Sequence, residues 1–545
     1  MSSGHLLDSL RRRAQSEPWK PALVLLAAGR IQQFSYAELW TEAERAARRW
    51  ASVGAGPGQV VFIVLRHGWQ AYAAFLGAMR AGLLPAFLPY PTPKQDPALY
   101  WASHCELFAR VRPAALLTYA DNAAELAAAA QGAAVLTLEN FDALPGADNL
   151  PGGPSADLPA FLQHSSGTTG LKKGVQITWA QLAAQVDSYA STLGFGPDDK
   201  VASWLPLYHD MGLITGFLMP LGLGATIVSI DPFEWVSRPT LLHEAIETYR
   251  ATFCWLPNFA FAHLVRTAGG EDRHDLSSIR AFINCSEPCK AETFEAFLER
   301  FAGQGVRPEA LQTCYAMAET VFAVSQSQTG RPPRVLEIDA DRFEAAGEII
   351  RAGEGAPRPR RLVSCGPPIA GIETRVAASP GEAGEIEVRG SFVFDGYFGN
   401  SEATAEAFAD GWYRTGDLGF LDGGELFVCG RRKEMLIVHG RNYYANDVEE
   451  VLAGAAGVKS GRAVVFAVFD PVTQSEEAVA MVEAAQAGAD PVALKRAVKK
   501  AVYDRLELTL RSVEILAAGE LVKTTSGKVS RDENRRRYLL DRAGR

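Results

Sequence analysis

Residues 163–175 read Gln163-His164-Ser165-Ser166-Gly167-Thr168-Thr169-Gly170-Leu171-Lys172-Lys173-Gly174-Val175 and directly follow an apolar stretch, residues 158–162. A strand that enters a loop of this composition is typical of a phosphate-binding loop. Glycines let backbone N–H groups close around an anion, hydroxyls donate further hydrogen bonds, and lysine supplies positive charge. The spacing differs from the G-x-x-x-x-G-K-[ST] pattern, so the segment predicts a nucleotide-binding enzyme outside the P-loop class. The alternative is a surface linker rich in glycine, serine and threonine.

Length and composition predict a large globular protein of the cytoplasm. The chain has 545 residues, 48% of them hydrophobic and 21% charged, with a net charge of −9. This length predicts about three to four domain units, and the acidic balance argues against a nucleic-acid partner. The N-terminus lacks the apolar core of a signal peptide, and no apolar run approaches the ~20 residues that span a bilayer. The seven cysteines are scattered, and we expect reduced thiols.

Periodic patterns predict an α/β fold. Ser35 and Glu38 form a capping box at the start of a helix. Residues 60–65, 114–119 and 133–138 read as short buried strands between helical segments, which predicts layers with largely parallel sheets. From Gly381 the chain changes to short strands punctuated by glycine, and after Gly430 helix and strand alternate again.

Six further segments place polar or charged side chains between apolar flanks. They read Trp204-Leu205-Pro206-Leu207-Tyr208-His209-Asp210-Met211-Gly212, Asn284-Cys285-Ser286-Glu287-Pro288, Cys314-Tyr315-Ala316-Met317-Ala318-Glu319-Thr320, Trp412-Tyr413-Arg414-Thr415-Gly416-Asp417-Leu418-Gly419, Gly430-Arg431-Arg432-Lys433-Glu434 and Lys523-Thr524-Thr525-Ser526-Gly527-Lys528-Val529-Ser530-Arg531. Each alone has a plain alternative, such as a core histidine, a turn aspartate or a solvated charged turn. In this order, and together with residues 163–175, they resemble the motifs of the adenylate-forming enzymes: acyl-CoA synthetases, adenylation domains and luciferases.

The resemblance implies an activity and a fold. These enzymes use ATP and Mg²⁺ to convert a carboxylic acid to an acyl-adenylate, with release of pyrophosphate, and then pass the acyl group to a thiol. The implied fold is α/β. A large N-terminal domain, residues 1–430, would contain layered α/β subdomains and a β-rich subdomain, and a small mobile α+β domain, residues 431–545, would carry the catalytic lysine.

The resemblance also implies residue roles. Lys528 is expected to stabilise the negative charge that accumulates in the transition state, His209 to lie beside the carboxylate, and Glu319 to hold Mg²⁺. Tyr315 can stack on adenine, and Asp417, on a tight turn, can accept from the ribose hydroxyls. The expected nucleotide-binding residues are Ser165, Ser166, Gly167, Thr168, Thr169, Gly170, Lys173, Ser286, Glu287, Pro288, Tyr315, Ala316, Met317, Thr320, Asp417, Arg431, Lys433 and Arg441. Lys433 would be the pivot of the C-terminal domain, and Arg441 would lie beside the pantetheine tunnel.

Two features resemble the fatty acyl-AMP ligase branch. One is the extended form of the segment, Tyr208-His209-Asp210-Met211-Gly212-Leu213, and the other is the additional segment 328–361. In that branch an extra piece restrains the C-terminal domain, and the acyl group goes to the phosphopantetheine of a separate acyl carrier protein. A neutral loop insertion is the alternative reading of residues 328–361. An acid–coenzyme A ligase and a non-catalytic adenylate-binding homologue are the alternative functions, although a protein that only binds has no chemical need for Lys528.

Bulky residues in the expected acyl pocket favour a short, medium or aromatic acid over a long-chain acid. Trp255 and Leu256 occupy positions where the branch often has small residues, and Ala316 and Cys285 stand where the family usually has glycine. The expected pocket residues are Trp204, Trp255, Leu256, Asn258, Ala316 and Met317.

Overall fold

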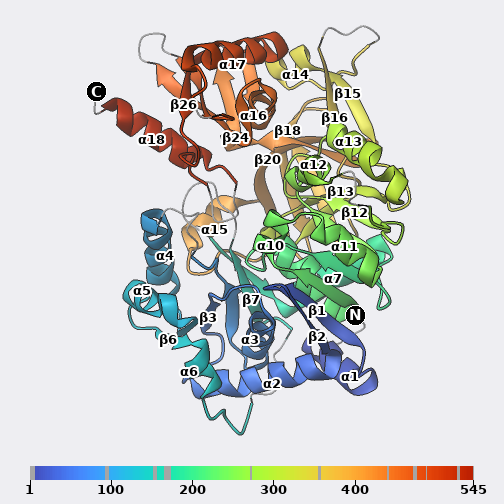
Figure 1. Ribbon diagram of the computed structural model, residues 1–545, viewed down its shortest axis with the longest axis vertical. Helices are drawn as coiled ribbons and strands as arrows, with labels where there is room; N and C mark the ends of the chain where they lie inside the picture. Colours follow the sequence, from blue (N-terminus) through green and yellow to red (C-terminus); the bar gives the residue numbers. More distant parts are fainter. Residues whose placement is uncertain are drawn as a thin grey trace.

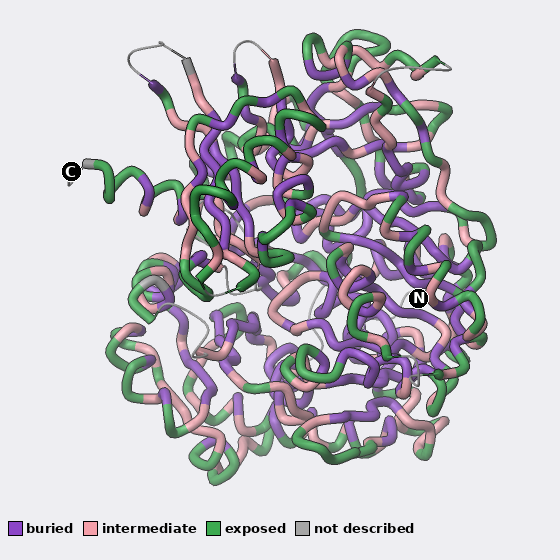
Figure 2. The backbone as a smooth tube through the Cα atoms, turned by 45° about the horizontal axis from the view of Figure 1, so that its top comes forward, coloured by how far each residue is buried: buried purple, intermediate pink, exposed green. Residues whose placement is uncertain are grey.

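The computed structural model describes residues 6–91, 97–150, 156–164, 173–269, 273–353, 358–438, 441–470, 475–486, 488–523 and 528–543. The fold is α/β, as expected, with a large N-terminal body and a smaller C-terminal group of elements at one end (Figure 1). Buried backbone runs through the strands of the body, whereas the C-terminal helix α18 (Arg531–Ala543) is largely exposed (Figure 2).

The first sheet of the body has four parallel strands in the order β4-β3-β5-β6. Its elements are β3 (Val60–Ile63), α3 (Trp69–Arg80), β4 (Leu84–Phe87), α4 (Pro97–Val111), β5 (Ala115–Thr118), α5 (Ala123–Ala129), β6 (Ala134–Thr137) and α6 (Leu138–Asp142). Strands β3, β4 and β5 are buried throughout, because crossover helices cover the faces of a parallel sheet. The predicted alternation of strands and helices is confirmed here.

The second sheet has eight strands in the order β14-β13-β12-β11-β9-β10-β1-β2. The strands from β13 to β1 are parallel, and the edge strands β2 and β14 are antiparallel to their neighbours. The strands are β1 (Pro21–Ala27), β2 (Arg30–Ser35), β9 (Lys200–Ser203), β10 (Thr226–Ile230), β11 (Phe253–Leu256), β12 (Ala281–Asn284), β13 (Leu311–Ala316) and β14 (Ala323–Gln326). The helices of this part are α1 (Leu6–Ser16), α2 (Tyr36–Ser52), α7 (Trp179–Leu193), α8 (Asp210–Leu213), α9 (Met219–Leu223), α10 (Pro232–Ser237), α11 (Leu241–Tyr249), α12 (Asn258–Thr267) and α13 (Ala291–Phe301). The capping box of Ser35 and Glu38 is confirmed at the start of α2.

The strand predicted before the phosphate-binding loop is half of a hairpin. Strand β7 (Pro159–His164) pairs antiparallel with β8 (Gly174–Thr178), and α7 follows with its own capping box between Thr178 and Gln181. Residues 165–172 lie outside the described residues, so the nucleotide-binding assignments of Ser165, Ser166, Gly167, Thr168, Thr169 and Gly170 stay predictions.

Short antiparallel strands follow Gly381, as the glycine pattern predicts, and one more strand precedes it. They are β17 (Ile372–Ala377), β18 (Gly384–Gly390), β19 (Phe408–Ala409), β20 (Trp412–Asp422) and β21 (Glu425–Arg431), with helix α15 (Ser401–Ala407) before β19. The additional segment forms a strand, helix and strand: β15 (Val335–Asp339), α14 (Ala340–Ala346) and β16 (Pro359–Val363). Strands β15 and β16 pair antiparallel with each other.

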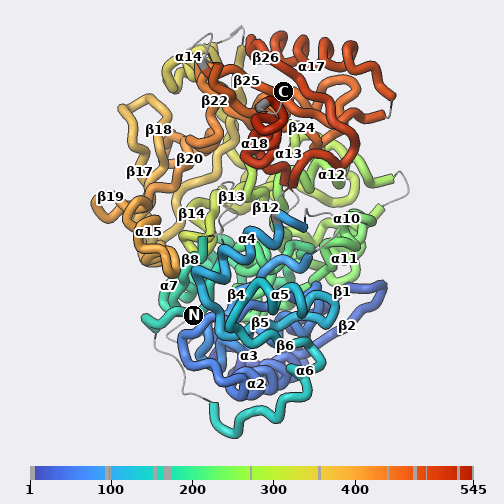
Figure 3. The backbone as a smooth tube through the Cα atoms, turned by 90° about the vertical axis from the view of Figure 1, so that its left-hand side faces the viewer, coloured from blue at the N-terminus to red at the C-terminus, as the bar shows by residue number. Residues whose placement is uncertain are grey.

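The C-terminal group has its own apolar core, and its elements lie together beyond α12 and α13 (Figure 3). They are β22 (Met435–Val438), β23 (Arg441–Tyr444), α16 (Ala445–Gly454), β24 (Val458–Asp470), β25 (Ser475–Ala484), α17 (Pro491–Leu506), β26 (Leu510–Leu516) and α18. No helix among the described residues combines the length and the apolar character needed to cross a membrane.

Candidate active site

The predicted motifs meet at one edge of the eight-stranded sheet. The Tyr208-His209 segment follows β9, and Ser286 and Glu287 follow β12. Tyr315 is the second-to-last residue of strand β13, and Glu319 comes shortly after that strand ends. Because β9, β12 and β13 are parallel members of one sheet, their carboxyl ends emerge on the same side. Ligand sites of open α/β sheets form at such edges.

Asp417, Tyr315 and Arg431 form one hydrogen-bonded group. The Tyr315 hydroxyl donates to Asp417 Oδ2 over 2.7 Å, and Arg431 Nε donates to Oδ1 over 3.1 Å. Asp417 is buried, and burial raises the pKa of its carboxyl, whereas the Arg431 charge and the Tyr315 hydroxyl lower it. The expectation of a tight turn is wrong: Asp417 lies within strand β20, directly after Gly416, whose φ of +73° interrupts regular strand geometry. The carboxylate is therefore rigidly placed between an aromatic ring and a cation.

Glu319 is a buried carboxylate in a short 3₁₀ turn, Ala318–Thr320. The Tyr397 hydroxyl donates to Glu319 Oε1 over 3.0 Å. Burial raises the pKa of Glu319, while the Tyr397 hydrogen bond lowers it. The turn is fixed from outside, because Gln163 Nε2 donates to the Val321 carbonyl over 2.9 Å and Val321 has a φ of +63°.

Thr320 closes the Glu319 turn from within. Its hydroxyl is fully buried and lies 2.8 Å from the Phe322 carbonyl oxygen and 3.1 Å from the Met317 carbonyl oxygen. This hydroxyl therefore binds the backbone of the turn, and its expected contact with phosphate stays a prediction.

His209 is the residue before helix α8, where it contacts Tyr208 with a ring-centroid separation of 4.8 Å. The half-buried Asp210 follows it; burial raises the pKa of Asp210, and the charges of Lys528 and Arg431 lower it. Sequence reasoning assigned Asp210 no role, although it lies in the same segment as His209. Its proximity to both cations is a property of the folded chain.

Lys528 reaches the body from the C-terminal group. Its ammonium donates to the Ser286 carbonyl over 3.0 Å and lies 3.9 Å from Glu287 Oε1. Ser286 has a φ of +68°, an uncommon conformation for a residue with a side chain. Glu287 Oε2 in turn accepts from the Phe259 backbone N–H over 2.9 Å. The structure thus brings the predicted catalytic lysine onto the segment predicted to bind adenine.

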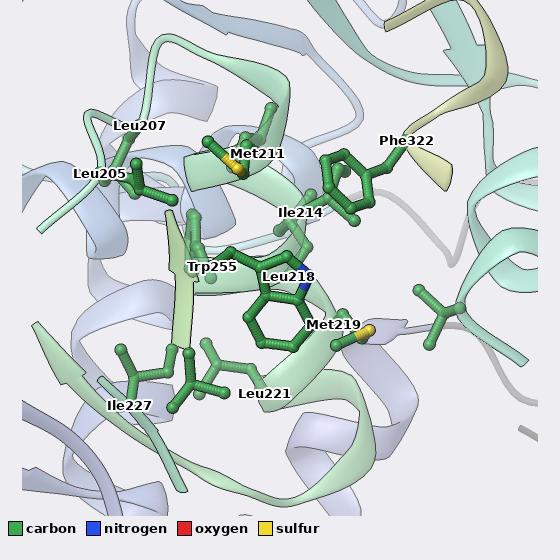
Figure 4. Close-up of a cluster of buried hydrophobic side chains, with 14 of the residues drawn as sticks. Leu205, Leu207, Met211, Ile214, Leu218, Met219, Leu221, Ile227, Trp255 and Phe322 are labelled. Atoms are coloured by element: carbon green, nitrogen blue, oxygen red, sulfur yellow. The ribbon is translucent and has the colours of Figure 1, made fainter. Parts of the chain in front are cut away.

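Trp255 fills the apolar interior behind this edge of the sheet. Only 1% of its surface is exposed, and it lies in the middle of the buried cluster drawn in Figure 4, whose labelled members include Ile214, Leu218 and Met219. Its indole N–H donates to the Tyr189 hydroxyl over 2.9 Å. That hydroxyl donates to Gln326 Oε1 over 2.9 Å, so a polar chain fixes the indole in the core.

The other predicted pocket residues have separate partners, and Leu256, the next residue of β11, points to the opposite face of the sheet from Trp255. Trp204 stacks on Trp235 with ring centroids 3.7 Å apart and an interplanar angle of 2°, while Leu256 is fully buried. Asn258 accepts a hydrogen bond from Asn284 Nδ2 over 2.8 Å. Ala316 and Met317 are half-buried and pack against the main core.

Lys173 and Arg441, two further residues predicted to bind the nucleotide, contact side chains that the sequence did not assign to the site. Lys173 Nζ lies 4.5 Å from the centroid of the Tyr397 ring, next to the Glu319 turn. Arg441 binds Asp341 and Glu344 of helix α14 over 3.0 and 2.7 Å and Glu507 over 3.0 Å. Arg441 thus links the C-terminal group to the additional segment, and its expected place beside a pantetheine tunnel stays a prediction, as does the pivot role of Lys433.

The geometry suits a nucleotide. Asp417 offers two acceptor oxygens beside the Tyr315 ring, which suits a nucleoside: the carboxylate can accept from the ribose hydroxyls, and the ring can stack on the base. The cations Lys173, Arg431 and Lys528 lie around buried carboxylates, as a polyphosphate and a divalent cation require. Among the described residues, no group of three or more histidine, cysteine or acidic side chains could hold a metal ion. Glu319 offers one buried carboxylate that could bind a metal ion.

The family described as AMP-binding enzyme matches residues 10–398 of the chain. The chain belongs to this family. The predicted resemblance to adenylate-forming enzymes, and among them to fatty acyl-AMP ligases, is confirmed.

Three relatives illustrate the similarity. The long-chain-fatty-acid–AMP ligase FadD26 of Mycobacterium bovis is 32% identical over 529 residues, which cover 89% of this chain and 88% of that protein. The medium-chain-fatty-acid–[acyl-carrier-protein] ligase JamA of Moorena producens is 33% identical over 407 residues, covering 71% of this chain and 68% of that protein. A solved structure from a study of fatty acyl-adenylate ligases from E. coli and L. pneumophila superposes with a TM-score of 0.91 at 27% identity, covering 100% of this chain and 98% of that chain.

Sequence reasoning missed Tyr397. It follows Asp395-Gly396 in a turn without a distinctive pattern, and its hydroxyl meets Glu319 only because the chain folds back over 78 residues. Nothing in its local sequence marks it as part of the site.

Proposed function

We propose that this enzyme uses ATP to convert a short, medium or aromatic carboxylic acid to an acyl-adenylate and then transfers the acyl group to the phosphopantetheine thiol of a separate acyl carrier protein. The observation that carries the proposal is the contact of Lys528 with Ser286 and Glu287. It brings a flexible cation from the C-terminal group to the edge of the sheet where the nucleotide-binding motifs meet.

Each step of adenylation has a residue suited to it. Tyr315 and Asp417 would hold the adenosine, and Arg431, which is bound to Asp417, would face the ribose or the phosphates. The acid's carboxylate oxygen attacks the α-phosphorus, and pyrophosphate leaves. Lys528 would lie between the carboxylate and the α-phosphate, where a preorganised cation lowers the energy of the developing negative charge.

Glu319 fits a magnesium ion. Its oxygens are hard ligands, as Mg²⁺ prefers, and one of them is already oriented by the Tyr397 hydroxyl. A bound Mg²⁺ would neutralise charge on the phosphates of ATP. The protein's part is to keep Glu319 ionised and in place in a site shielded from water.

The additional segment supports a carrier protein as acceptor. Helix α14 supplies Asp341 and Glu344, which bind Arg441 of the C-terminal group. Glu344 is buried and is also bound by Arg358, whose Nη2 lies 2.8 Å from Glu344 Oε1. Such a network restrains the orientation of the C-terminal group, as the resemblance to fatty acyl-AMP ligases implies, and JamA is named a ligase of an acyl carrier protein. A coenzyme A ligase is the alternative.

Trp255 supports the preference for a compact acid. The indole belongs to the same buried cluster as Leu205, Leu207 and Met211 of the His209 segment, and both Tyr189 and the surrounding core fix its position. A long straight acyl chain would have to displace this indole. FadD26 is named a long-chain ligase, so the proposed preference rests on the indole and not on that relative.

One screen tests the proposal. Pyrophosphate release is measured over linear acids of increasing length and substituted benzoic acids, and acyl transfer is then measured with coenzyme A and with a holo-carrier protein. We expect release with compact acids and transfer to the carrier. Transfer to coenzyme A alone would support the alternative ligase, and nucleotide binding without release over the whole series would support a non-catalytic homologue.

A further inference from the structure

Tyr397 contacts two residues that the proposed function places at the phosphates of ATP. Its hydroxyl donates to Glu319 Oε1 over 3.0 Å, and its ring lies under the Lys173 ammonium, 4.5 Å from ring centroid to Nζ. The tyrosine is buried. One side chain therefore touches both the expected metal ligand and a lysine of the expected phosphate-binding loop.

The backbone around Tyr397 leaves this side chain little freedom. Its N–H donates to Thr404 Oγ1 over 2.9 Å, and it forms a bridge with Val175 of β8. The next residue, Phe398, donates its N–H to the Gly174 carbonyl over 2.8 Å. These bonds attach the Tyr397 turn to the strand that leaves the phosphate-binding loop.

The opposite side of the tyrosine is fixed by aromatic packing. Phe394 packs edge-on against the Tyr397 ring with centroids 4.8 Å apart, and its backbone N–H donates to the Glu319 carbonyl over 2.8 Å. The Tyr413 hydroxyl lies 3.5 Å from the Tyr397 hydroxyl. The phenol is thus held in place before any ligand binds, as an orienting group requires.

We propose that Tyr397 is a positioning residue, which orients Glu319 through its hydroxyl and seats the Lys173 ammonium over its ring, so that both face the phosphates of one nucleotide. The inference rests on the proposed function. Groups that hydrogen-bond a metal-ligating carboxylate orient it, and losing them typically weakens metal binding about 10–100-fold.

The test is Tyr397→Phe, which keeps the ring under Lys173 and removes only the hydroxyl. Binding of Mn²⁺ in place of Mg²⁺ is measured by electron paramagnetic resonance in the presence of a non-hydrolysable ATP analogue. We expect Mn²⁺ binding to weaken about 10–100-fold. The matched control is Tyr36→Phe, since Tyr36 is also buried and donates one hydrogen bond, to the Ala225 carbonyl over 2.7 Å. It should leave Mn²⁺ binding unchanged.

A double-variant cycle separates orientation of Glu319 from a general structural effect. In a Glu319→Gln background, Tyr397→Phe should change Mn²⁺ binding by less than about threefold, because the carboxylate that it orients is gone. Unchanged Mn²⁺ binding in the single Tyr397→Phe variant, or an equal loss in both backgrounds, would overturn the inference while leaving the proposed function intact. A wild-type protein that releases no pyrophosphate with any acid would instead refute the proposed function.

Discussion

Replacing Trp255 by alanine should lengthen the acids that the enzyme accepts. The indole is 1% exposed and lies within the buried cluster that also contains Leu205, Leu207 and Met211 of the His209 segment. We expect its removal to open a cavity that an acyl chain can enter. Room for about four methylenes, each contributing about 0.8 kcal/mol on burial, corresponds to about 3.2 kcal/mol. At 1.4 kcal/mol per factor of ten, this corresponds to about 200-fold. In the Trp255→Ala variant, kcat/KM for an acid about four methylenes longer should therefore rise about 200-fold relative to that for the acid that the wild type prefers.

The substitution also has a cost that the structure predicts. Truncating a buried tryptophan typically lowers the free energy of unfolding by about 3–5 kcal/mol, which most domains survive. Phe253→Ala is the matched control, because Phe253 is fully buried on the same strand and stacks on Trp255 with ring centroids 5.7 Å apart. Its stability loss should be similar, without any change in chain-length preference.

The assay is kcat/KM for pyrophosphate release across a series of linear acids, measured for the wild type and both variants. A wild-type preference for long-chain acids would refute the pocket argument. So would equal lengthening by Phe253→Ala, because the effect would then come from a loosened core and not from space vacated by Trp255.

Three further substitutions address the remaining roles. Lys528→Ala should lower adenylation about 10²–10³-fold without loss of folding, measured by pyrophosphate exchange and thermal unfolding; near-normal exchange would contradict its role. Glu319→Gln should raise the Mg²⁺ concentration for half-maximal activity by about tenfold or more, and an unchanged Mg²⁺ titration would remove Glu319 from the metal site. Arg441→Ala should leave adenylation intact and increase acyl transfer to coenzyme A, whereas Lys500→Ala on the exposed face of α17 should change neither; no gain in transfer would exclude the ion pairs as a restraint.

The sequence predicted the fold class and the motifs that meet at the candidate site, whereas the edge of the sheet where they meet is known only from the structure. Periodicity and the Ser35 capping box are local properties of the sequence and could be predicted for that reason. The order of the motifs is also read directly from the sequence, and the resemblance to the family rests on it. The place of Asp417 within β20 was missed, because a glycine with positive φ inside a strand reads locally as a turn. Contacts between distant segments, such as Tyr397 with Glu319, leave no local signal. Arg441 shows the same limit, since its partners Asp341 and Glu344 lie 97 to 100 residues away and Glu507 lies 66 residues away.

The contacts between the C-terminal group and the body include Lys528 on Ser286, Arg441 on Glu344, and the pairs of Asp447 with Lys290 and Arg360. The first two differ in what it costs to break them. Lys528 is partly exposed, so its bond to Ser286 can be replaced by water at little cost. Glu344 is buried, so losing Arg441 costs more than losing an exposed partner, although Arg358 remains bound to the same carboxylate. Any rotation that brings a thiol to the acyl-adenylate would therefore be opposed more by the bond between Arg441 and Glu344 than by the catalytic lysine.

This difference accounts for the proposed choice of acceptor. A rotation of the C-terminal group would separate Arg441 from Glu344. With coenzyme A as acceptor, only the binding energy of that small molecule can offset this loss. A carrier protein brings a surface, and a standard protein–protein interface buries about 800 Å² on each partner. Contacts of that size can offset the loss of the bonds from Arg441 to Asp341 and Glu344 as the C-terminal group turns. The additional segment would thus disfavour coenzyme A, because a small thiol supplies too little binding energy to break the bonds of Arg441. Arg441→Ala is the substitution that should remove most of this preference for a carrier protein.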